Sequence, residues 1–199
     1  MDNIIEFGLL NQKQKASAVE LFMAGFGRFM TFSKDEELKR RLFLEIFDSK
    51  LFLCYIAEDK VLGLMGLATC KKRPINFKPE VCKKYFGKIR GAIISSQMNA
   101  IFQSPVVKGD NELYLDVLVT DSNSRRSGVG TELLKYAFNL TGYDVMYTEV
   151  FSKNVGAIGF YQRNGFKLEK EERFSILRLQ GEGYPLRMQT GIEKKNGLK

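Results

Sequence analysis

Histidine is absent from the 199 residues of this chain, and so is tryptophan. Without histidine, the sequence excludes Ser-His and Cys-His nucleophilic pairs, histidine-ligated metals and histidine general bases. Any acid or base in a reaction must therefore be Asp, Glu, Tyr, Lys or Cys. We expect no metal site.

Cysteine is scarce: only Cys54, Cys70 and Cys82 are present. Their number is odd and no pair has CxxC spacing, so neither a disulfide framework nor a zinc knuckle is predicted. Reduced thiols of this kind fit the cytoplasm, which is the location that we expect.

Long uncharged runs are also missing. The longest, residues 91–107, contains polar amides and a proline, so no membrane-spanning helix is expected. Charged residues interrupt every candidate for a secretory segment in the first thirty residues, and we expect none there. These residues are Glu6, Lys13, Lys15, Glu20 and Arg28.

Apolar residues are plentiful, with 44% hydrophobic and 12% aromatic side chains, and no linker divides the chain. We therefore predict a single domain over residues 1–199. The net charge of +8 is concentrated between residues 71 and 90, where eight cations are opposed only by Glu80. This cluster is either a site for a polyanion or acidic ligand, or a solvated helix face.

Hydrophobic periodicity predicts hairpins in the first half of the chain and alternating strands and helices in the second. Expected strands span residues 4–9, 51–57, 61–68, 113–119, 145–151, 166–179 and 184–190. Expected helices span residues 12–26, a second segment capped by Ser33, 79–101, 128–140 and 154–164. The helix 79–101 belongs to a basic insertion over about 71–111, and its inward stripe is expected to hold Val81, Tyr85, Ile89, Ile93, Gln97 and Ile101.

A glycine-containing turn joins the apolar strand 113–119 to the helix that follows it. Its two glycines let successive main-chain N–H groups point at one spot, and the helix start adds about half a positive charge. Two arginines supply charge-assisted hydrogen bonds, so the turn suits a pyrophosphate. Its residues are Arg125, Arg126, Ser127, Gly128, Val129, Gly130 and Thr131.

The pattern Arg125-x-x-Gly128-x-Gly130 after an apolar strand resembles the acetyl-coenzyme A (acetyl-CoA) motif of the GNAT superfamily of N-acetyltransferases. A second segment, one helix and one strand later, is similar to another signature of that superfamily. It reads Asn154-x-x-Ala157-x-x-Phe160-Tyr161-x-x-x-Gly165-Phe166. The resemblance is dense over residues 112–170, whereas the insertion departs from the usual short turn.

The resemblance implies an α/β (α+β) fold: a mixed, mostly antiparallel sheet of six to seven strands flanked by helices. It implies acetyl-CoA as the acyl donor and direct transfer of an acetyl group to an amine. The resemblance places Val117, Leu118 and Val119 beside the donor, where their main chain would form hydrogen bonds with the pantetheine arm. Asn154 and Ala157 are further expected donor contacts, although Asn154 also suits a helix N-cap.

A neutral amine is needed for attack, and a lysine-like amine is mostly protonated at pH 7. Glu149 lies in an otherwise apolar strand and is the first candidate base. Asp116 is its rival, and Glu112 a weaker one. Tyr161 is the candidate general acid, matching the tyrosine of ribosomal-protein N-terminal acetyltransferases. Alternatively, Glu149 pairs with a cation and Tyr161 closes its helix onto the sheet.

The acceptor is not specified by the sequence. We expect the insertion and the first two helices to shape its pocket, and cationic walls favour an acceptor that carries an acid group. The alternatives are a CoA-sensing domain without catalysis and a nucleic-acid-binding module that uses the insertion. A homodimer through the terminal strands is also considered.

Overall fold

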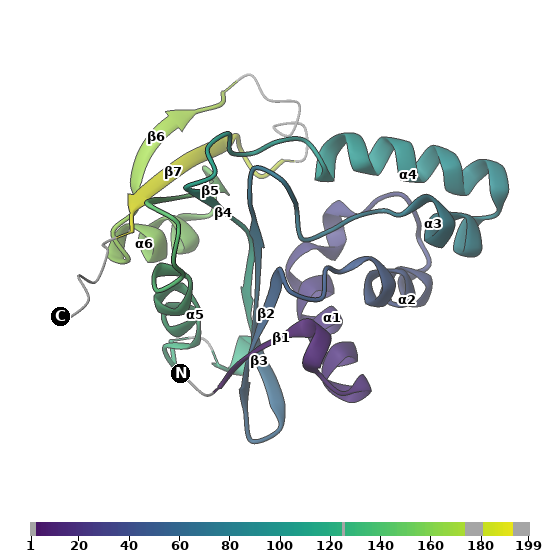
Figure 1. Ribbon diagram of the computed structural model, residues 1–199, viewed down its shortest axis with the longest axis horizontal. Coiled ribbons are helices and arrows are strands. Elements are labelled where there is room, and N and C mark those ends of the chain that lie inside the picture. The colour runs from purple at the N-terminus through teal and green to yellow at the C-terminus, as the bar shows by residue number, and fades with distance from the viewer. Residues whose placement is uncertain (1–2, 125, 174–180, 193–199) are drawn as a thin grey trace.

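The computed structural model describes residues 3–124, 126–173 and 181–192. A seven-stranded sheet forms the centre of this part of the chain (Figure 1), and every neighbouring pair is antiparallel except β4 and β5. This confirms the mixed, mostly antiparallel sheet. In spatial order its strands are β1 (Ile4–Glu6), β2 (Phe52–Ala57), β3 (Lys60–Ala68), β4 (Glu112–Thr120), β5 (Val145–Phe151), β7 (Pro185–Gly191) and β6 (Lys167–Glu171).

Helices cover both faces of the sheet (Figure 1). One face carries α5 (Val129–Phe138) and α6 (Val155–Arg163). On the other side lie α1 (Gln12–Phe26), α2 (Glu36–Ile46), α3 (Pro79–Phe86) and α4 (Lys88–Phe102). Three short 3-10 turns join these elements: η1 (Phe7–Leu9), η2 (Gly27–Phe29) and η3 (Ser122–Ser124).

Two hydrophobic cores correspond to the two faces. On the α1 side, aromatic rings dominate: the centroids of Phe22 and Phe43 lie 4.7 Å apart, and those of Phe47 and Phe52 lie 4.0 Å apart. On the α5 side the core is mainly aliphatic. Each fully buried side chain of this size stabilises the fold by about 1.5–3 kcal/mol, so both layers are held firmly to the sheet.

The hairpin β2–β3 follows the sequence prediction closely. Glu58 and Asp59 both have positive φ, 48° and 63°, as a two-residue type I′ turn requires. Several other predicted boundaries were wrong. The first strand ends at Glu6, and helix α2 is capped by Asp35, whose Oδ1 accepts the Leu38 N–H at 2.9 Å.

The insertion contains two helices where one was predicted. The break falls at Gly87, which has φ +79°. The helices then pack closely, because a Cβ at Gly91 would lie only 2.5 Å from the carbonyl oxygen of Cys82. After this turn Ile94 and Ser95 face inward.

The predicted inward stripe of the insertion was therefore wrong beyond Gly87. Val81 is buried and Tyr85 is partly buried, but the stripe residues of α4 face outward. Ile89, Ile93 and Ile101 are 80%, 51% and 61% exposed. A helical period cannot be carried across a residue in the left-handed region, so the pattern lost its register there.

The last strands lie in reversed order. β7 pairs with both β5 and β6, so β1 and β6 form the edges of the sheet in the described residues. Residues 174–179 of the expected strand 166–179 lie outside the described residues. Within the described ranges, no helix is long and apolar enough to cross a membrane.

Candidate active site

Strands β4 and β5 pair over only half of their length. The parallel register runs from Glu112 opposite Val145 to Leu115 opposite Thr148, and it stops there. Thr148 closes the pairing, since its Oγ1 donates to the carbonyl of Leu115 at 3.0 Å. Beyond this point the two strands separate, leaving the β5-facing edge of β4 without a strand partner.

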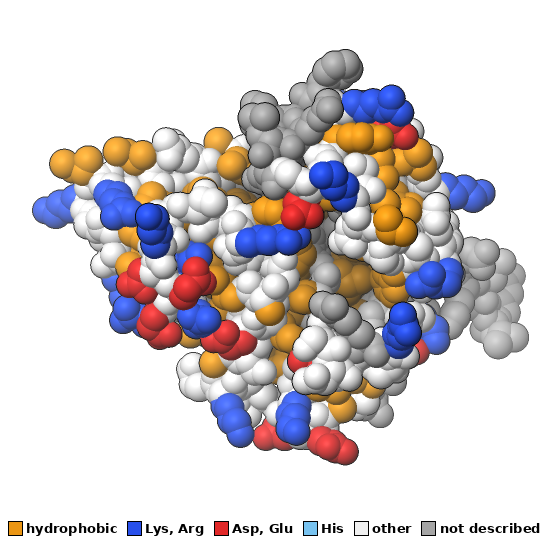
Figure 2. Space-filling model, turned by 180° about the vertical axis from the view of Figure 1, so that it is seen from behind, with side chains coloured by type: hydrophobic (Ala, Val, Ile, Leu, Met, Phe, Trp, Pro, Cys, Tyr) orange, Lys and Arg blue, Asp and Glu red, His pale blue; other side chains and the backbone are white. Residues whose placement is uncertain are grey.

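A cleft of about 1180 Å³ opens between the separated strands. Its walls come from α1 and η2, from the end of β4, from the turn into α5, and from β5 and α6. Figure 2 shows the surface hollowed between the half with α1 to α4 and the half with α5 and α6, with apolar side chains inside.

Most of the predicted site residues line this cleft. They are Asp116, Leu118, Val119, Arg126, Gly128, Val129, Gly130, Thr131, Glu149, Asn154, Ala157 and Tyr161. Val117 does not, because its side chain is buried in the core on the α1 side. Ser127 turns away and donates to the carbonyl of Ser124 at 2.5 Å. Arg125 lies outside the described residues.

The turn into α5 has the backbone shape that its glycines predict. Gly128 has φ +90° with open space where a Cβ would point, and Arg126 is also left-handed, at φ 65°. In the described residues no side chain caps α5. The N–H groups of its first turn have no intrahelical partners, so they remain donors for an anion.

The two motif helices meet at this turn. A Cβ on Gly130 would lie 3.2 Å from the ring of Phe160, on α6. Asn154 caps α6, its Oδ1 accepting the Ala157 N–H at 3.1 Å. Asn154 thus has the structural role of a helix N-cap, and it also lines the cleft.

A β-bulge in β4 sets the position of Asp116. Gly66 pairs with Val117 while the next residue, Leu67, pairs with Leu115, so Asp116 is the extra residue. Bulges of this type re-aim side chains. Here Asp116 and Val117 both face the α1 side of the sheet, where Arg73 of the insertion reaches the carboxylate.

Asp116 is held by a bidentate ion pair. Arg73 donates from Nε to Oδ2 at 3.0 Å and from Nη2 to Oδ1 at 2.6 Å, and both side chains are only 11% exposed. Burial raises the pKa of Asp116, and the charge of Arg73 opposes this. Both oxygens of the carboxylate are thus occupied.

Glu149 is less tightly held. It lies opposite Arg187 in the β5–β7 register and accepts from its Nη1 at 3.3 Å, with 31% of its side chain exposed. Burial raises the pKa of Glu149, and the neighbouring Arg187 opposes that rise. The expected cationic neighbour exists, but Glu149 still faces the cleft.

Glu112 binds a local turn instead. Its Oε2 accepts the main-chain N–H groups of Lys108 and Gly109 at 2.8 and 2.9 Å, and these bonds lower its pKa. Glu112 is not among the described residues that line the cleft. Its arrangement is that of a turn-stabilising carboxylate.

Tyr161 lies on the opposite side of β5 from Glu149. It projects from α6 between the rings of Phe160 and Phe166, with centroids at 5.4 and 5.3 Å. Burial raises the pKa of Tyr161 to about 12. Its phenol therefore stays protonated at neutral pH, within hydrogen-bonding reach of Thr148.

Four of the eight cations between residues 71 and 90 form ion pairs in the described part of the chain, three of them with acids outside the insertion. Besides the Arg73–Asp116 pair, three of its lysines form ion pairs: Lys71–Asp110 at 2.9 Å, Lys72–Asp48 at 2.5 Å and Lys84–Glu45 at 2.6 Å. None of the described residues that line the cleft comes from 71–111, nor from α2. Of the elements that were expected to shape the acceptor pocket, only α1 contributes described residues to this cleft.

Sequence reasoning missed several cleft residues. Thr148 sits at the point of strand separation, and Arg163 and Asn164 follow Phe160 by one helical turn on α6. That spacing was a usable signal. The α1–η2 segment gave no such signal for Phe26, Arg28 and Phe29, because only the fold brings these residues to the cleft. There Arg28 pairs with Glu182 at 3.2 Å, and Phe29 contacts Phe151 with ring centroids 5.6 Å apart.

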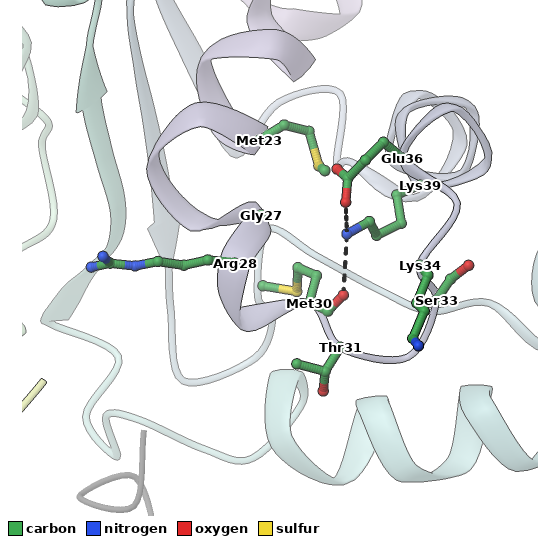
Figure 3. A pocket seen from close by; sticks show the side chains of 9 residues that line it. All are labelled: Met23, Gly27, Arg28, Met30, Thr31, Ser33, Lys34, Glu36 and Lys39. Carbon is green, nitrogen blue, oxygen red and sulfur yellow. Dashed lines mark hydrogen bonds and ion pairs between the residues drawn. The ribbon is translucent and has the colours of Figure 1, made fainter. Parts of the chain in front are cut away.

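A smaller pocket of about 460 Å³ lies on the other side of η2 (Figure 3). Its buried Lys39 is already bonded to Glu36, at 2.6 Å, and to the carbonyl of Met30, at 3.4 Å. Arg28 points away from the other lining side chains. The buried ammonium group of this pocket is therefore already paired.

Comparison with known proteins agrees with this geometry. The model of the acetyltransferase (GNAT) family matches residues 19–166. No curated protein sequence matches the chain.

Similar solved structures include an N-acetyltransferase from Staphylococcus aureus Mu50, with TM-score 0.63 and 12% identity, covering 94% of this chain and 99% of the other. The ribosomal-protein-S18-alanine N-acetyltransferase from Escherichia coli has TM-score 0.55 and 16% identity, covering 98% and 97%. A chain of the NatC complex, solved with Gag peptide and CoA, has TM-score 0.56 and 14% identity, covering 96% and 98%. At these identities the likeness concerns the fold.

Proposed function

This chain belongs to the acetyltransferase (GNAT) family, and on that premise we propose that it transfers an acetyl group from acetyl-CoA directly to an amine. The observation that carries the proposal is the separation of β4 and β5 after Leu115 and Thr148. It opens one cleft that holds an anion-binding helix start, a carboxylate and a phenol.

The donor fits the residues present. Arg126 and the main-chain N–H groups from Gly128 to Thr131 would bind its pyrophosphate, because a helix start and a guanidinium both favour anions. The free edge of β4 from Val117 to Val119 offers main-chain groups for the pantetheine amides, as in strand addition. Bound acetyl-CoA supplies the activated acyl carbon.

We assign the general base to Glu149 in preference to Asp116. Both oxygens of Asp116 accept short bonds from Arg73, and proton uptake there would break a buried ion pair. Glu149 has one longer contact, at 3.3 Å, and a side chain that reaches the cleft. It would take the ammonium proton of the acceptor, directly or through water, leaving a neutral nitrogen to attack.

We assign the general acid to Tyr161. As the new C–N bond forms and the C–S bond breaks, the thiolate needs a proton, and a phenol that stays protonated at neutral pH can give it. The proton that the nitrogen loses on becoming an amide would restore the phenol, and the proton held by Glu149 would leave to solvent. Glu149 and Tyr161 approach the cleft from opposite faces of the sheet. The acceptor would enter from the side of α1 and the donor thioester would lie between them.

The test is turnover of Tyr161→Phe with acetyl-CoA and an amine that a mass-spectrometric library screen identifies. We expect the rate constant to fall by about 10²–10⁴-fold while the Kd for acetyl-CoA, measured by calorimetry, stays the same. The matched control is Tyr136→Phe, a partly buried tyrosine on α5 that does not line the cleft. Unchanged turnover in Tyr161→Phe would remove Tyr161 from the mechanism. A wild-type chain with no turnover on any amine would favour the CoA-sensing alternative.

A further inference from the structure

Arg187 lies at the junction of three parts of the fold, directly beside Glu149. It is the cross-strand partner of Glu149 on β7, and its side chain is only 20% exposed. Residues that pair across two strands project to the same face of the sheet. The two side chains therefore start from neighbouring positions on the same face of the sheet.

Three other groups fix the Arg187 guanidinium. Its Nε donates to Glu169 of β6 at 2.9 Å, and its Nη2 donates to the carbonyl of Val106, at the end of the insertion, at 2.8 Å. It also lies over the ring of Tyr147, 4.6 Å from the centroid. Only a planar guanidinium can form this fork and stack at once.

The contact with Glu149 is the longest of the three polar contacts, at 3.3 Å. Glu169 and the carbonyl of Val106 thus hold the guanidinium in place. Glu149 lies close to this positive charge but makes only the longest of the three contacts with it. This differs from Asp116, whose guanidinium partner occupies both oxygens. A base needs this combination, because it must be ionised before the reaction and still have an oxygen free to accept a proton.

We infer that Arg187 is a positioning residue of the acetyl transfer: it holds a cation beside Glu149, keeps this carboxylate aimed at the cleft, and ties it to the insertion through Val106. The inference rests on the proposed role of Glu149 as the base. It also gives the insertion a function that needs no direct contact with the substrate.

Other charged groups act on Glu149 from every neighbouring element. Burial raises its pKa, and Glu172, just after β6, raises it further. Arg187 and, more weakly, Arg73 of the insertion lower it. Burial raises the pKa of Tyr114 of β4, and the nearby charge of Glu149 raises it further. Loss of Arg187 leaves burial and Glu172 opposed mainly by Arg73, so the pKa of Glu149 must rise.

The experiment is a carboxyl titration of the full chain by NMR with ¹³C-labelled glutamate, where Glu149→Gln identifies the resonance. We expect Arg187→Met to raise the titration midpoint of Glu149 by about one pH unit or more, because a close cation shifts a carboxyl by that amount. Arg187→Lys keeps the charge and should shift it less. Arg173→Met, which removes an exposed arginine paired with Glu171, is the matched control and should leave it unchanged.

If Arg187→Met does not fold, Glu169→Gln provides a second test. It removes the competing carboxylate and should lower the Glu149 midpoint. Equal midpoints in the wild type and in the variant that folds would overturn the inference.

Turnover with the same amine across pH separates the two proposals. The acidic limb of kcat/KM should move upward in Arg187→Met by the same amount as the titration, whereas a general loss of structure lowers the rate at every pH. Wild-type turnover in Glu149→Gln would refute Glu149 as the base. An inactive Glu149→Gln together with an unshifted Arg187→Met would refute only the role of Arg187.

Discussion

The stretch from β4 to α6 and the segment formed by α1 and η2 face each other across one cleft, and they contribute to it by different means. The first presents main-chain groups, namely the free edge of β4, the left-handed turn at Gly128 and the start of α5, together with the side chains of Glu149 and Tyr161. The second contributes the side chains of Arg28 and Phe29 to the wall, and Arg73 of the insertion pairs with Asp116 from outside the cleft lining.

Main-chain sites and side-chain sites depend on the sequence in different ways. A main-chain site needs a particular turn, and the turn needs glycine at a defined position. A side-chain site needs partners from distant segments, such as Arg73 and Asp116, which are 43 residues apart. Variants on the two sides should therefore fail in different ways.

The largest effect should come from breaking the buried pair. Arg73→Met leaves Asp116 uncompensated inside the fold, and we expect a loss of about 3–5 kcal/mol in the free energy of unfolding, measured by urea denaturation. The control is Lys72→Met. Lys72 forms an ion pair with Asp48, but its side chain is 62% exposed. An equal loss in both variants would mean that the buried pair contributes no more than a surface one.

The next effect concerns the main-chain side. Gly128→Val forces a branched residue to φ +90°, so the turn should change shape and the Kd for acetyl-CoA should rise about tenfold or more. Gly142→Val is the matched control, since Gly142 has φ +92° and equally open space but does not line the cleft. Calorimetry with both variants measures the difference. Wild-type affinity in Gly128→Val would refute the anion-binding turn.

A smaller effect should appear on the acceptor side. Phe29→Ala removes a ring that contacts Phe151 in the cleft wall, and we expect the KM for the amine to rise about threefold to tenfold. The Kd for acetyl-CoA should not change. If instead donor affinity falls and the acceptor KM does not, the two sides of the cleft have been assigned the wrong way round.

The smallest effect should come from the exposed part of the basic insertion. Lys84→Gln removes an ion pair with Glu45 in which the lysine is 61% exposed, and solvent screens such pairs strongly. We expect no measurable change in melting temperature or in turnover at moderate salt. A clear loss of turnover would indicate that the insertion binds a ligand after all.

Much of the fold could be predicted because local patterns are sufficient where strands and helices are regular. The helix 12–26 and the strand 145–151 were predicted with the bounds that the structure shows. The insertion failed at Gly87, where a single left-handed residue rotates everything after it. The sequence pointed to the glycine turn, Glu149 and Tyr161, which all line the cleft. Thr148 and Arg187 gave no signal, because their importance lies in which atoms they meet.

By itself, the sequence determined the turn from Arg126 to Thr131, the strand and helix on either side of it, and the exclusion of histidine chemistry. Those features depend on backbone preferences and on residue type, which are local properties. Only the tertiary structure decided where β4 and β5 separate, that Arg73 occupies Asp116, and that Arg187 stands beside Glu149. These depend on contacts between segments far apart in the chain, which no local pattern encodes.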